Sequence, residues 1–311
     1  MIEHTEIVPL NPVFLRLGGF SIRWYAVLIL IGVGIGLYMA TKEGIKKGFN
    51  KDLFVDLVSI GLPISIIGGR LYYVLFNPRF YFRNPERIIR VWEGGLAIHG
   101  VLIAALLYAW YALRKKKLPL LPVLDIVSVS FFVGQIIGRF GNFMNQEAYG
   151  FAIYGESLDV QRGFLESLFL PRFIIDNMFI NGAYHHPTFL YEAVWNFIGL
   201  MIAIFVLRKM SKVLVGEIAA FYAIWYSVGR IFIEIFRTDS LMIGNMMVAQ
   251  LISVNIILVV LLLVVYRRLR GSNYVFYKDF SVADKSVLKE NRKQAYLEMV
   301  KKGSKDSKKR G

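Results

Sequence analysis

Long apolar stretches recur along the chain, and shorter polar segments separate them. A helix needs about 20 mainly apolar residues to cross the hydrocarbon core of a bilayer. The pattern therefore predicts an all-α integral membrane protein with about seven transmembrane helices. The predicted spans are residues 20–40, 53–76, 96–113, 122–138, 188–207, 215–236 and 247–266.

Basic residues follow every second predicted span. Clusters of Lys and Arg come after the first, third, fifth and seventh spans, as in residues 42–51 and 114–117. Because cytoplasmic loops are enriched in Lys and Arg, we expect the N-terminus outside and the C-terminus in the cytoplasm. Residues 77–95 depart from this rule, with four arginines on the expected outer side. We interpret them as a helix lying in the outer interface; a miscounted span is the alternative.

Two longer segments lie outside the predicted spans. Residues 151–187 are expected to form an extracytoplasmic arm within a membrane-embedded domain of residues 1–266, because loops of this length are uncommon without a function. Residues 267–311 are expected to form a basic cytoplasmic tail, with 14 Lys or Arg and 5 Asp or Glu. Its charge is typical of membrane orientation and anionic lipid rather than of nucleic-acid binding. We expect the tail to be flexible apart from a helix near 284–300, so that deleting residues 275–311 leaves function nearly intact.

Composition narrows the chemistry that this chain can perform. Apolar residues make up 56% of the chain, which exceeds the share in most soluble domains. The absence of cysteine excludes disulfides, cysteine metal sites and a thiolate nucleophile supplied by the protein itself. No His-Glu-x-x-His, Gly-x-Ser-x-Gly or phosphate-binding glycine-rich loop occurs, so we expect neither a metal nor a cofactor. Residues 1–19 have mixed polarity, and the first span is therefore expected to be an uncleaved helix.

A group of polar residues follows the fourth predicted span. Arg139, Asn142 and Asn145 share one face at helical spacing, and Glu147 comes directly after them. A charge at the bilayer centre costs about 2.5 to 3.5 kcal/mol on insertion scales, so these residues are expected to face a polar pocket or one another. Arginine suits a phosphate because its planar guanidinium donates two hydrogen bonds at once. We predict an anion site here, with Glu147 holding a cation or accepting a proton; an ion pair that only joins two helices is the alternative.

Glycines are frequent in the same segment. Gly134, Gly138 and Gly141 allow neighbouring backbone to approach closely. We also expect Gly141 and Gly150 to permit turns with positive φ. Residues 134–150 are therefore expected to line the pocket.

A second polar stripe lies in the sixth predicted span. Tyr226, Arg230, Glu234 and Arg237 are separated by four, four and three positions and fall on one helical face. The remaining residues of the span are mainly apolar and can face lipid, so the stripe predicts an interior polar wall. We expect Glu234 to neutralise one arginine and to leave the other for a ligand. A voltage sensor would place arginines at every third position without a glutamate between them.

His99 opens the third predicted span and lies among glycines that would let a ligand approach its imidazole. Histidine exchanges protons near neutral pH, which suits a proton acceptor. A histidine that only packs between helices is the alternative interpretation.

Weaker candidates lie at the ends of other spans. Tyr25, at the outer end of the first span, is a candidate site residue, and a place in an interfacial aromatic belt is the alternative. Arg70, within the second span, is expected to shape the cavity. His186 and the pair Tyr191-Glu192 begin the fifth span, and His186 fits a loop or a helix cap equally well.

This ordered set of motifs resembles the prolipoprotein diacylglyceryl transferase family. The longest match is Gly138-Arg139-Phe140-Gly141-Asn142-Phe143-Met144-Asn145-Gln146-Glu147-Ala148-Tyr149-Gly150. Shorter matches are Ile22-Arg23-Trp24-Tyr25, Gly68-Gly69-Arg70, Val91-Trp92-Glu93-Gly94-Gly95, His99-Gly100, His186-Pro187, Tyr191-Glu192 and Gly229-Arg230 with Glu234 and Arg237. The matches extend over residues 20–266 but leave out the arm and the tail. The family often has a further glycine where this chain has Val101, which affects the clearance around His99.

The resemblance implies a multi-pass enzyme of the bacterial cytoplasmic (inner) membrane with its active site toward the outer face. Such an enzyme transfers the diacylglyceryl group of phosphatidylglycerol to the lipobox cysteine thiol of a preprolipoprotein signal peptide. A thioether forms and glycerol 1-phosphate leaves, as the first step of lipoprotein maturation. The expected partners are phosphatidylglycerol, the preprolipoprotein signal peptide and the lipid bilayer, with no nucleic acid.

The resemblance also implies roles for individual residues. It gives catalytic roles to His99, Arg139 and Arg230. We expect binding or supporting roles for Tyr25, Arg70, Asn142, Asn145, Glu147, Gly150, Tyr226, Glu234 and Arg237.

The residue types fit this chemistry. A cysteine thiol has a pKa near about 8.5, so the substrate thiol needs a base or a positive field to become a thiolate. Arg139 and Arg230 can stabilise the charge of a phosphate leaving group in a site of low dielectric constant. His99 is the expected proton acceptor; thiolate formation by the arginines, with His99 only positioning, is the alternative. A transporter with an anion site is the competing function, although no repeat between the two halves supports it, and a membrane scaffold is the third.

Overall fold

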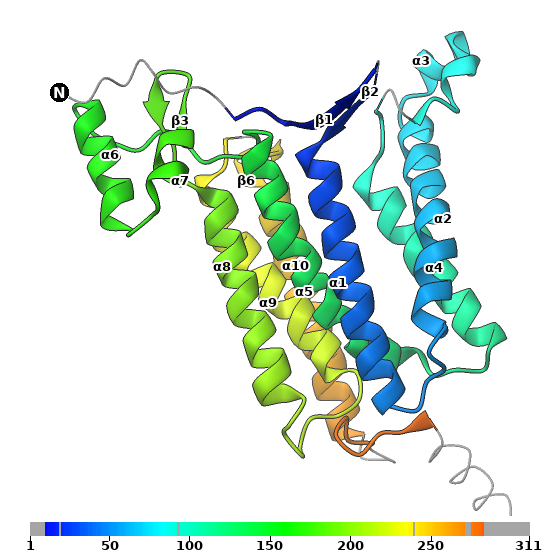
Figure 1. The fold of residues 1–311 in the computed structure, drawn as a ribbon. Coiled ribbons are helices and arrows are strands. Elements are labelled where there is room, and N and C mark those ends of the chain that lie inside the picture. The colour runs from blue at the N-terminus through cyan, green and yellow to red at the C-terminus, as the bar shows by residue number, and fades with distance from the viewer. Residues whose placement is uncertain (1–9, 19, 92–93, 239, 271–274, 283–311) are drawn as a thin grey trace, which may run out of the picture. The chain divides into compact units, whose positions relative to one another are not determined.

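Long helices account for most of the chain in the computed structural model, which describes residues 10–18, 20–91, 94–238, 240–270 and 275–282 (Figure 1). The predicted α class is therefore confirmed. The chain divides into two units, each of which is described here by itself. The first unit contains Met1–Met39 and Leu124–Lys278, and the second contains Ala40–Val123 and Asp279–Gly311.

The first unit contains most of the long helices. They are α1 (Trp24–Lys46, as far as Met39), α5 (Leu120–Met144, from Leu124), α8 (Thr188–Met201), α9 (Glu217–Ile233) and α10 (Val248–Leu269). A π-helical segment, η4 (Ile202–Leu207), continues α8, and a 3-10 turn, η5 (Glu234–Phe236), continues α9. Antiparallel hairpins are formed by β1 (Val13–Leu17) with β2 (Phe20–Arg23) and by β5 (Met242–Ile243) with β6 (Met246–Met247). The first helix therefore begins at residue 24, because residues 20–23 belong to a strand.

The second unit is built on a close pair of helices. Its elements are the end of α1, α2 (Leu53–Leu75), α3 (Pro78–Arg83), the 3-10 turn η2 (Pro85–Arg87) and α4 (Ile98–Lys115). A Cβ atom on Gly68 would lie 2.9 Å from the backbone oxygen of Gly100, and one on Gly100 would lie 2.5 Å from that of Gly68. Paired small residues of this kind let membrane helices approach closely. The single interfacial helix expected over 77–95 is replaced by α3 and η2, and its place in the interface stays a prediction.

The described residues include six helices that are long and apolar enough to cross a membrane. They are α1, α2, α5, α8 with η4, α9 with η5, and α10, and they match six of the predicted spans. The remaining predicted span, 96–113, is the 18-residue helix α4, whose last turn contains Arg114 and Lys115. The total of seven spans and their orientation stay predictions.

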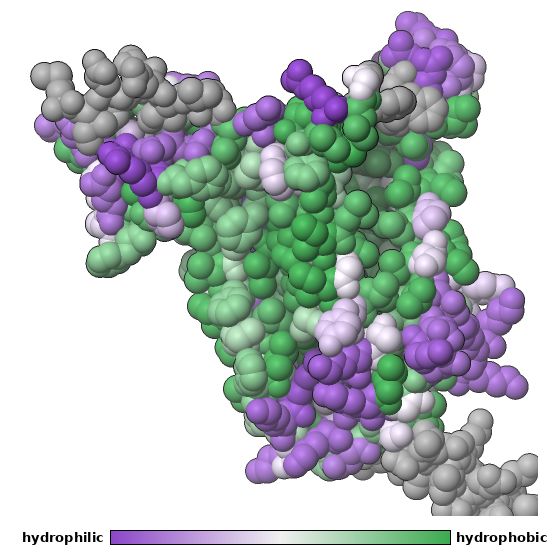
Figure 2. Space-filling view, in the orientation of Figure 1, coloured by the Kyte–Doolittle hydropathy of each residue, from purple (hydrophilic) through white to green (hydrophobic). Residues whose placement is uncertain are grey.

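On the face shown in Figure 2, apolar side chains cover the long helices, and hydrophilic residues gather near the helix ends. In the most apolar stretch of α10, only 6% of the residues are buried inside the protein. A helix that exposes such a surface is suited to lipid rather than to water.

The predicted arm is a folded part of the first unit between α5 and α8. It contains α6 (Leu158–Ser167), α7 (Arg172–Asn177) and the hairpin of β3 (Phe179–Ile180) with β4 (Ala183–Tyr184). The buried Arg162 side chain donates to the Asp176 carboxylate at 2.9 Å, to the Tyr184 hydroxyl at 3.0 Å and to the Glu166 carboxylate at 2.9 Å. Its location outside the cytoplasm stays a prediction.

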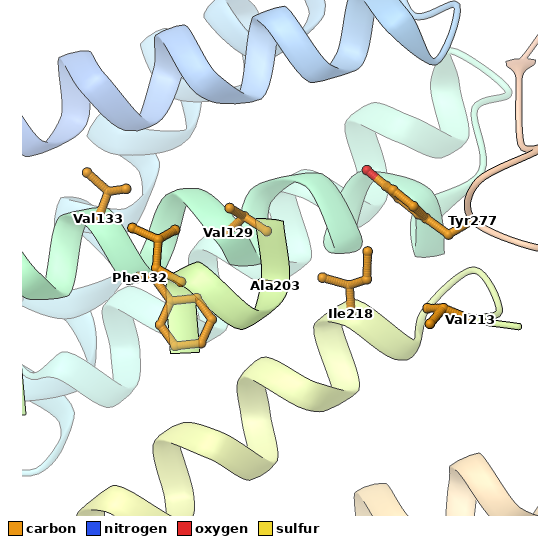
Figure 3. Packing of buried hydrophobic residues seen from close by; sticks show 8 residues of the cluster. Val129, Phe132, Val133, Ala203, Val213, Ile218 and Tyr277 are labelled. Atoms are coloured by element: carbon orange, nitrogen blue, oxygen red, sulfur yellow. The ribbon is translucent and has the colours of Figure 1, made fainter. Parts of the chain in front are cut away.

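A buried apolar cluster joins α5, the α8–η4 helix and the start of α9 (Figure 3). Its buried members are Val129, Phe132, Val133, Leu200, Ala203, Val213, Ile218 and Tyr277. Tyr277 is fully buried, and its backbone N–H donates to the Val213 carbonyl at 2.8 Å. The expected flexibility of the tail is therefore wrong for residues 275–278, which pack into the core of the first unit. The helix expected near 284–300 lies outside the described residues.

Candidate functional site

Three arginines meet the carboxylate of Glu192 in the first unit. Glu192 lies in the second turn of α8 and is 5% exposed. Its Oε2 atom lies 2.5 Å from Nη2 of Arg139 on α5. Its Oε1 atom lies 3.6 Å from Nη1 of Arg230 on α9 and 3.4 Å from Nη1 of Arg237, just beyond η5. One buried carboxylate therefore holds together residues that are far apart in the sequence.

A second carboxylate, Glu234, contacts two of the same arginines. Its Oε2 atom lies 2.9 Å from Nη2 of Arg230 and 4.0 Å from Nε of Arg237. The Ser240 hydroxyl donates to its other oxygen, Oε1, at 2.8 Å. Glu234 is therefore closest to Arg230 and lies farther from Arg237, and the expectation that one arginine is left for a ligand stays a prediction. The predicted stripe of Arg230, Glu234 and Arg237 is confirmed as one contiguous group.

We call Arg139, Arg230, Arg237, Glu192 and Glu234 the arginine cluster. Its three arginines contact two carboxylates among the described residues. The side chains of Arg139 and Arg230 are each 19% exposed, whereas that of Arg237 is 10% exposed and the two carboxylates are almost fully buried. Arg139 and Arg230 are thus the more exposed arginines of the cluster. Among the described residues, no group of three or more Asp, Glu or His side chains could hold a metal ion.

Polar side chains at the end of α5 extend the cluster. Arg139 Nη1 donates to Asn142 Oδ1 at 3.4 Å, and Asn142 Nδ2 donates to Glu147 Oε1 at 2.9 Å. Asn145 Nδ2 donates to the same Glu147 oxygen at 3.3 Å, while the buried Asn145 Oδ1 has no hydrogen-bond partner. The predicted shared face is confirmed. Glu147 holds two amides rather than the expected cation, and it acts on Arg139 through Asn142.

Gly141 and Gly150 allow close approach without positive φ, whereas a Cβ atom on Gly134 or Gly138 would meet no other atom within 4 Å. A Cβ atom on Gly141 would lie 2.7 Å from the Tyr25 ring, so the start of α1 packs against the end of α5 at this glycine. A Cβ atom on Gly150 would lie 2.9 Å from the Phe236 carbonyl oxygen, and Gly150 bridges Arg237. The expected positive φ at Gly141 and Gly150 is therefore wrong.

Two other residues of the segment adopt the left-handed conformation. Gln146 has a φ of 49° and Ala148 a φ of 55°. Such backbone in non-glycine residues costs on the order of 1–3 kcal/mol and often occurs at functional sites. Here it turns the chain at Glu147, between α5 and the bridge to Arg237. The Ala148 carbonyl accepts a hydrogen bond from the Thr188 hydroxyl at 2.7 Å, which fixes this turn to the start of α8.

Tyr226 lies one helical turn before Arg230 on α9. Its ring stacks on Tyr222 with centroids 6.3 Å apart. The spacing of four residues puts Tyr226 on the same helix face as Arg230, and its binding role stays a prediction.

Arg70 and His99 belong to the second unit. Arg70 is buried and donates to the carbonyls of Ile88, Gly94 and Gly95 at 2.8, 2.6 and 3.0 Å, and also to that of Arg87. It therefore fixes the loop before α4, and its substrate-binding role stays a prediction. Trp92 and Glu93 of the matched motif lie outside the described residues.

His99 occupies the first turn of α4 and is exposed. Its ring stacks on Tyr72 of α2 with centroids 6.0 Å apart. Val101, at the position where the family often has glycine, packs so closely that a Cβ atom on Gly69 would lie 2.5 Å from its side chain. The action of His99 together with Arg139 stays a prediction.

Glu192 belongs to the Tyr191-Glu192 motif, but no role was predicted for it. A carboxylate in the second turn of an apolar span is costly unless a cation meets it, and that signal was present in the sequence. The partners of Glu192 could not be identified from spacing, because they lie on other helices.

A model of the prolipoprotein diacylglyceryl transferase family matches residues 12–266. Phosphatidylglycerol–prolipoprotein diacylglyceryl transferase of Halalkalibacterium halodurans is 49% identical over 266 residues, which cover 85% of this chain and 89% of the relative. The enzymes of the same name from Bacillus licheniformis and Bacillus mycoides are each 46% identical, over 89% and 86% of this chain and 99% and 95% of their own length. The chain belongs to the prolipoprotein diacylglyceryl transferase family.

Proposed function

We propose that this chain transfers the diacylglyceryl group of phosphatidylglycerol to the lipobox cysteine of preprolipoproteins, with the lipid phosphate bound by Arg139 and Arg230. The observation that carries the proposal is the arginine cluster, in which Arg139 and Arg230 are the most exposed of the three guanidinium groups. The relatives are named for phosphatidylglycerol and prolipoprotein, and a phosphodiester is the anion that the first of these substrates offers.

The reaction moves charge onto the phosphate. The cysteine sulfur attacks the glycerol carbon that bears the phosphate, and a carbon–sulfur bond forms as the carbon–oxygen bond breaks. The electron pair of the broken bond stays on the phosphate oxygen, and glycerol 1-phosphate leaves with one more negative charge than the diester carried. In this scheme, the thiol proton passes to the imidazole of His99. Guanidinium groups fixed in advance around that oxygen stabilise the developing charge without having to reorganise.

Glu192 and Glu234 have a supporting part in this scheme. They hold the arginines in place before the lipid arrives, so that the arginines do not repel one another. Asn142 and Glu147 fix Arg139 from the other side. The site is expected to open toward the outer face of the cytoplasmic membrane, with the N-terminus outside.

A reconstituted transfer assay tests the proposal. The purified full chain in phosphatidylglycerol vesicles, with the lipid labelled in its glycerol backbone or acyl chains, is incubated with a lipobox peptide. Label on the peptide is the expected result, and a peptide with serine at the lipobox cysteine is the control. Movement of anions across the vesicle without labelled peptide would instead support a transporter.

A further inference from the structure

Three polar side chains next to the arginine cluster have buried oxygen atoms without a hydrogen-bond partner. They are Gln135 Oε1 on α5, Asn196 Oδ1 on α8 and Ser227 Oγ on α9. Asn196 is 2% exposed and Ser227 is fully buried. A buried polar group left unpaired costs about 1–3 kcal/mol, so most such groups in proteins have a partner. We call Gln135, Asn196 and Ser227 the amide layer.

Each member of the amide layer lies one helical turn from a member of the arginine cluster. A separation of three or four residues puts two side chains on the same helix face, about 5.4 Å apart along the axis. The pairs are Gln135 with Arg139, Asn196 with Glu192, and Ser227 with Arg230.

Contacts about one helical turn beyond the amide layer, on the side away from the arginine cluster, show that α5, α8 and α9 lie side by side at this level. A Cβ atom on Gly199 of α8 would lie 2.8 Å from the Phe132 ring of α5. The same Phe132 ring lies 4.9 Å, centroid to centroid, from the Tyr222 ring of α9. The amide layer therefore lies between the arginine cluster and the buried apolar cluster that contains Phe132.

Space is open beside this layer. A Cβ atom added to Gly134 or to Gly138 would meet no other atom within 4 Å. These glycines neighbour Gln135 and Arg139 on α5, so one side of the helix offers bare backbone next to both polar side chains.

We propose that the amide layer binds the ester groups of the diacylglyceryl moiety. The inference rests on the proposed function, which puts the lipid phosphate on Arg139 and Arg230. The ester groups follow the phosphate by only a few bonds along the lipid, so they fall about one turn further along the same helices. Primary amides reverse by half a turn about their last bond, so Gln135 and Asn196 present NH₂ groups to an ester carbonyl, and the Ser227 hydroxyl also donates.

Holding both ends of the lipid serves the reaction. The phosphate must leave while the glycerol carbon stays in line with the attacking sulfur. Hydrogen bonds to the ester carbonyls retain the group that is transferred, and the arginine cluster retains the group that departs. Fixed reactants of this kind react faster because their orientation is already set.

The test compares two lipids with one headgroup. Phosphatidylglycerol with ester-linked chains and its ether-linked analogue, which lacks the carbonyl groups, are given separately to the full-length enzyme with a lipobox peptide. We expect the wild-type kcat/KM to favour the ester lipid by about threefold to tenfold for each hydrogen bond. Asn196→Leu and Ser227→Ala should move that ratio toward one, mainly by lowering kcat/KM for the ester lipid. The ratio does not depend on how much of a variant is folded.

Ser253→Ala is the matched control. The Ser253 side chain is also buried, on α10, which packs against α9, but its hydroxyl donates to the Ala249 carbonyl at 2.7 Å. This variant should keep the wild-type ratio. A wild-type ratio of one, or variants that lower the activity on both lipids equally, would overturn the inference while leaving the proposed function intact. Failure of the wild type to transfer either lipid would overturn the proposed function as well.

Discussion

Glu192 binds Arg139 through one carboxylate oxygen and faces Arg230 and Arg237 with the other. The two oxygens thus join α5 to the end of α9 across α8. Without this carboxylate, Arg139, Arg230 and Arg237 would lose the group that joins all three. Breaking a buried ion pair by removing one partner costs about 3–5 kcal/mol, because the charges that remain are uncompensated.

We therefore predict that Glu192→Gln lowers both stability and activity. The unfolding free energy should fall by about 3 kcal/mol, and transfer should fall at least tenfold as the arginines separate. Glu192→Asp, which keeps the charge on a shorter side chain, should recover part of both. Thermal unfolding in detergent and the peptide transfer assay measure the two effects.

Glu166→Gln on the arm is the control for that experiment. Glu166 also pairs with a buried arginine, Arg162, but its side chain is 53% exposed. Exposed ion pairs contribute little, so this variant should stay close to the wild type in both measurements. Equal losses in the two variants would mean that the position of Glu192 in the arginine cluster has no special role.

Arg139→Lys should impair transfer even though it keeps the positive charge. Lysine cannot donate two parallel hydrogen bonds from a planar group, and here one guanidinium contacts both Glu192 and Asn142. We expect the turnover number to fall on the order of 100-fold, as when one donor to a developing negative charge is lost. Arg139→Ala and His99→Gln should abolish transfer while the protein still inserts into the membrane. Full activity in Arg139→Ala would remove the phosphate-binding role of that residue.

Helices were predictable here because lipid imposes them. A backbone without water must satisfy its own hydrogen bonds, so each apolar stretch of sufficient length becomes a helix. The stripe of Arg230, Glu234 and Arg237 was predictable for a related reason, since side-chain spacing along one helix fixes the shared face.

Contacts between elements could not be read from spacing. The meeting of α5, α8 and α9 at Glu192 depends on tertiary structure. The packing of Tyr277 into the buried apolar cluster depends on tertiary structure as well. The left-handed backbone at Gln146 and Ala148 gives no sequence signal, because neither residue type usually adopts it. The arginines of the site were therefore predictable from the sequence, whereas the role of Glu192 in joining them was not.

Asp125→Ala should destabilise the first unit without affecting the chemistry. The fully buried Asp125 carboxylate on α5 accepts hydrogen bonds from the Gly216 and Ala219 backbone N–H groups at the start of α9. Losing it leaves both donors unpaired, at a cost of about 2–3 kcal/mol. The unfolding temperature should drop, whereas the KM for lipid should stay near the wild-type value in the folded fraction. Asp56→Asn, in the exposed Asp56–Lys116 pair, is the control and should change stability little.

Stability should also depend on pH through His186. Burial of the ring and the nearby His185 lower the pKa of His186 in the folded protein, while its Nδ1 lies 3.1 Å from the Tyr191 hydroxyl. The unfolded chain, with a histidine pKa near about 6.5, then binds more protons than the folded protein. The stabilising effect of the neutral ring is complete above that pH and is lost as the pH falls toward the lowered pKa. The unfolding temperature should decrease from pH 7 to pH 5 in the wild type and less so in His186→Asn; equal slopes would exclude His186 as the cause.

Two truncations separate the buried part of the C-terminal segment from the residues beyond it. Deleting residues 283–311 keeps every described contact of residues 275–282, so the unfolding temperature and transfer activity should stay near those of the wild type. Deleting residues 275–311 also removes Tyr277 and Phe280, both of which are buried, so we now expect this deletion to destabilise the protein strongly instead of leaving function nearly intact. Tyr277→Ala in the full chain should cost about 3–5 kcal/mol, as for other large aromatic side chains in cores. Thermal unfolding of the three variants shows whether residues 275–282 stabilise the core. A Tyr277→Ala variant as stable as the wild type would show that this segment lies on the core without stabilising it.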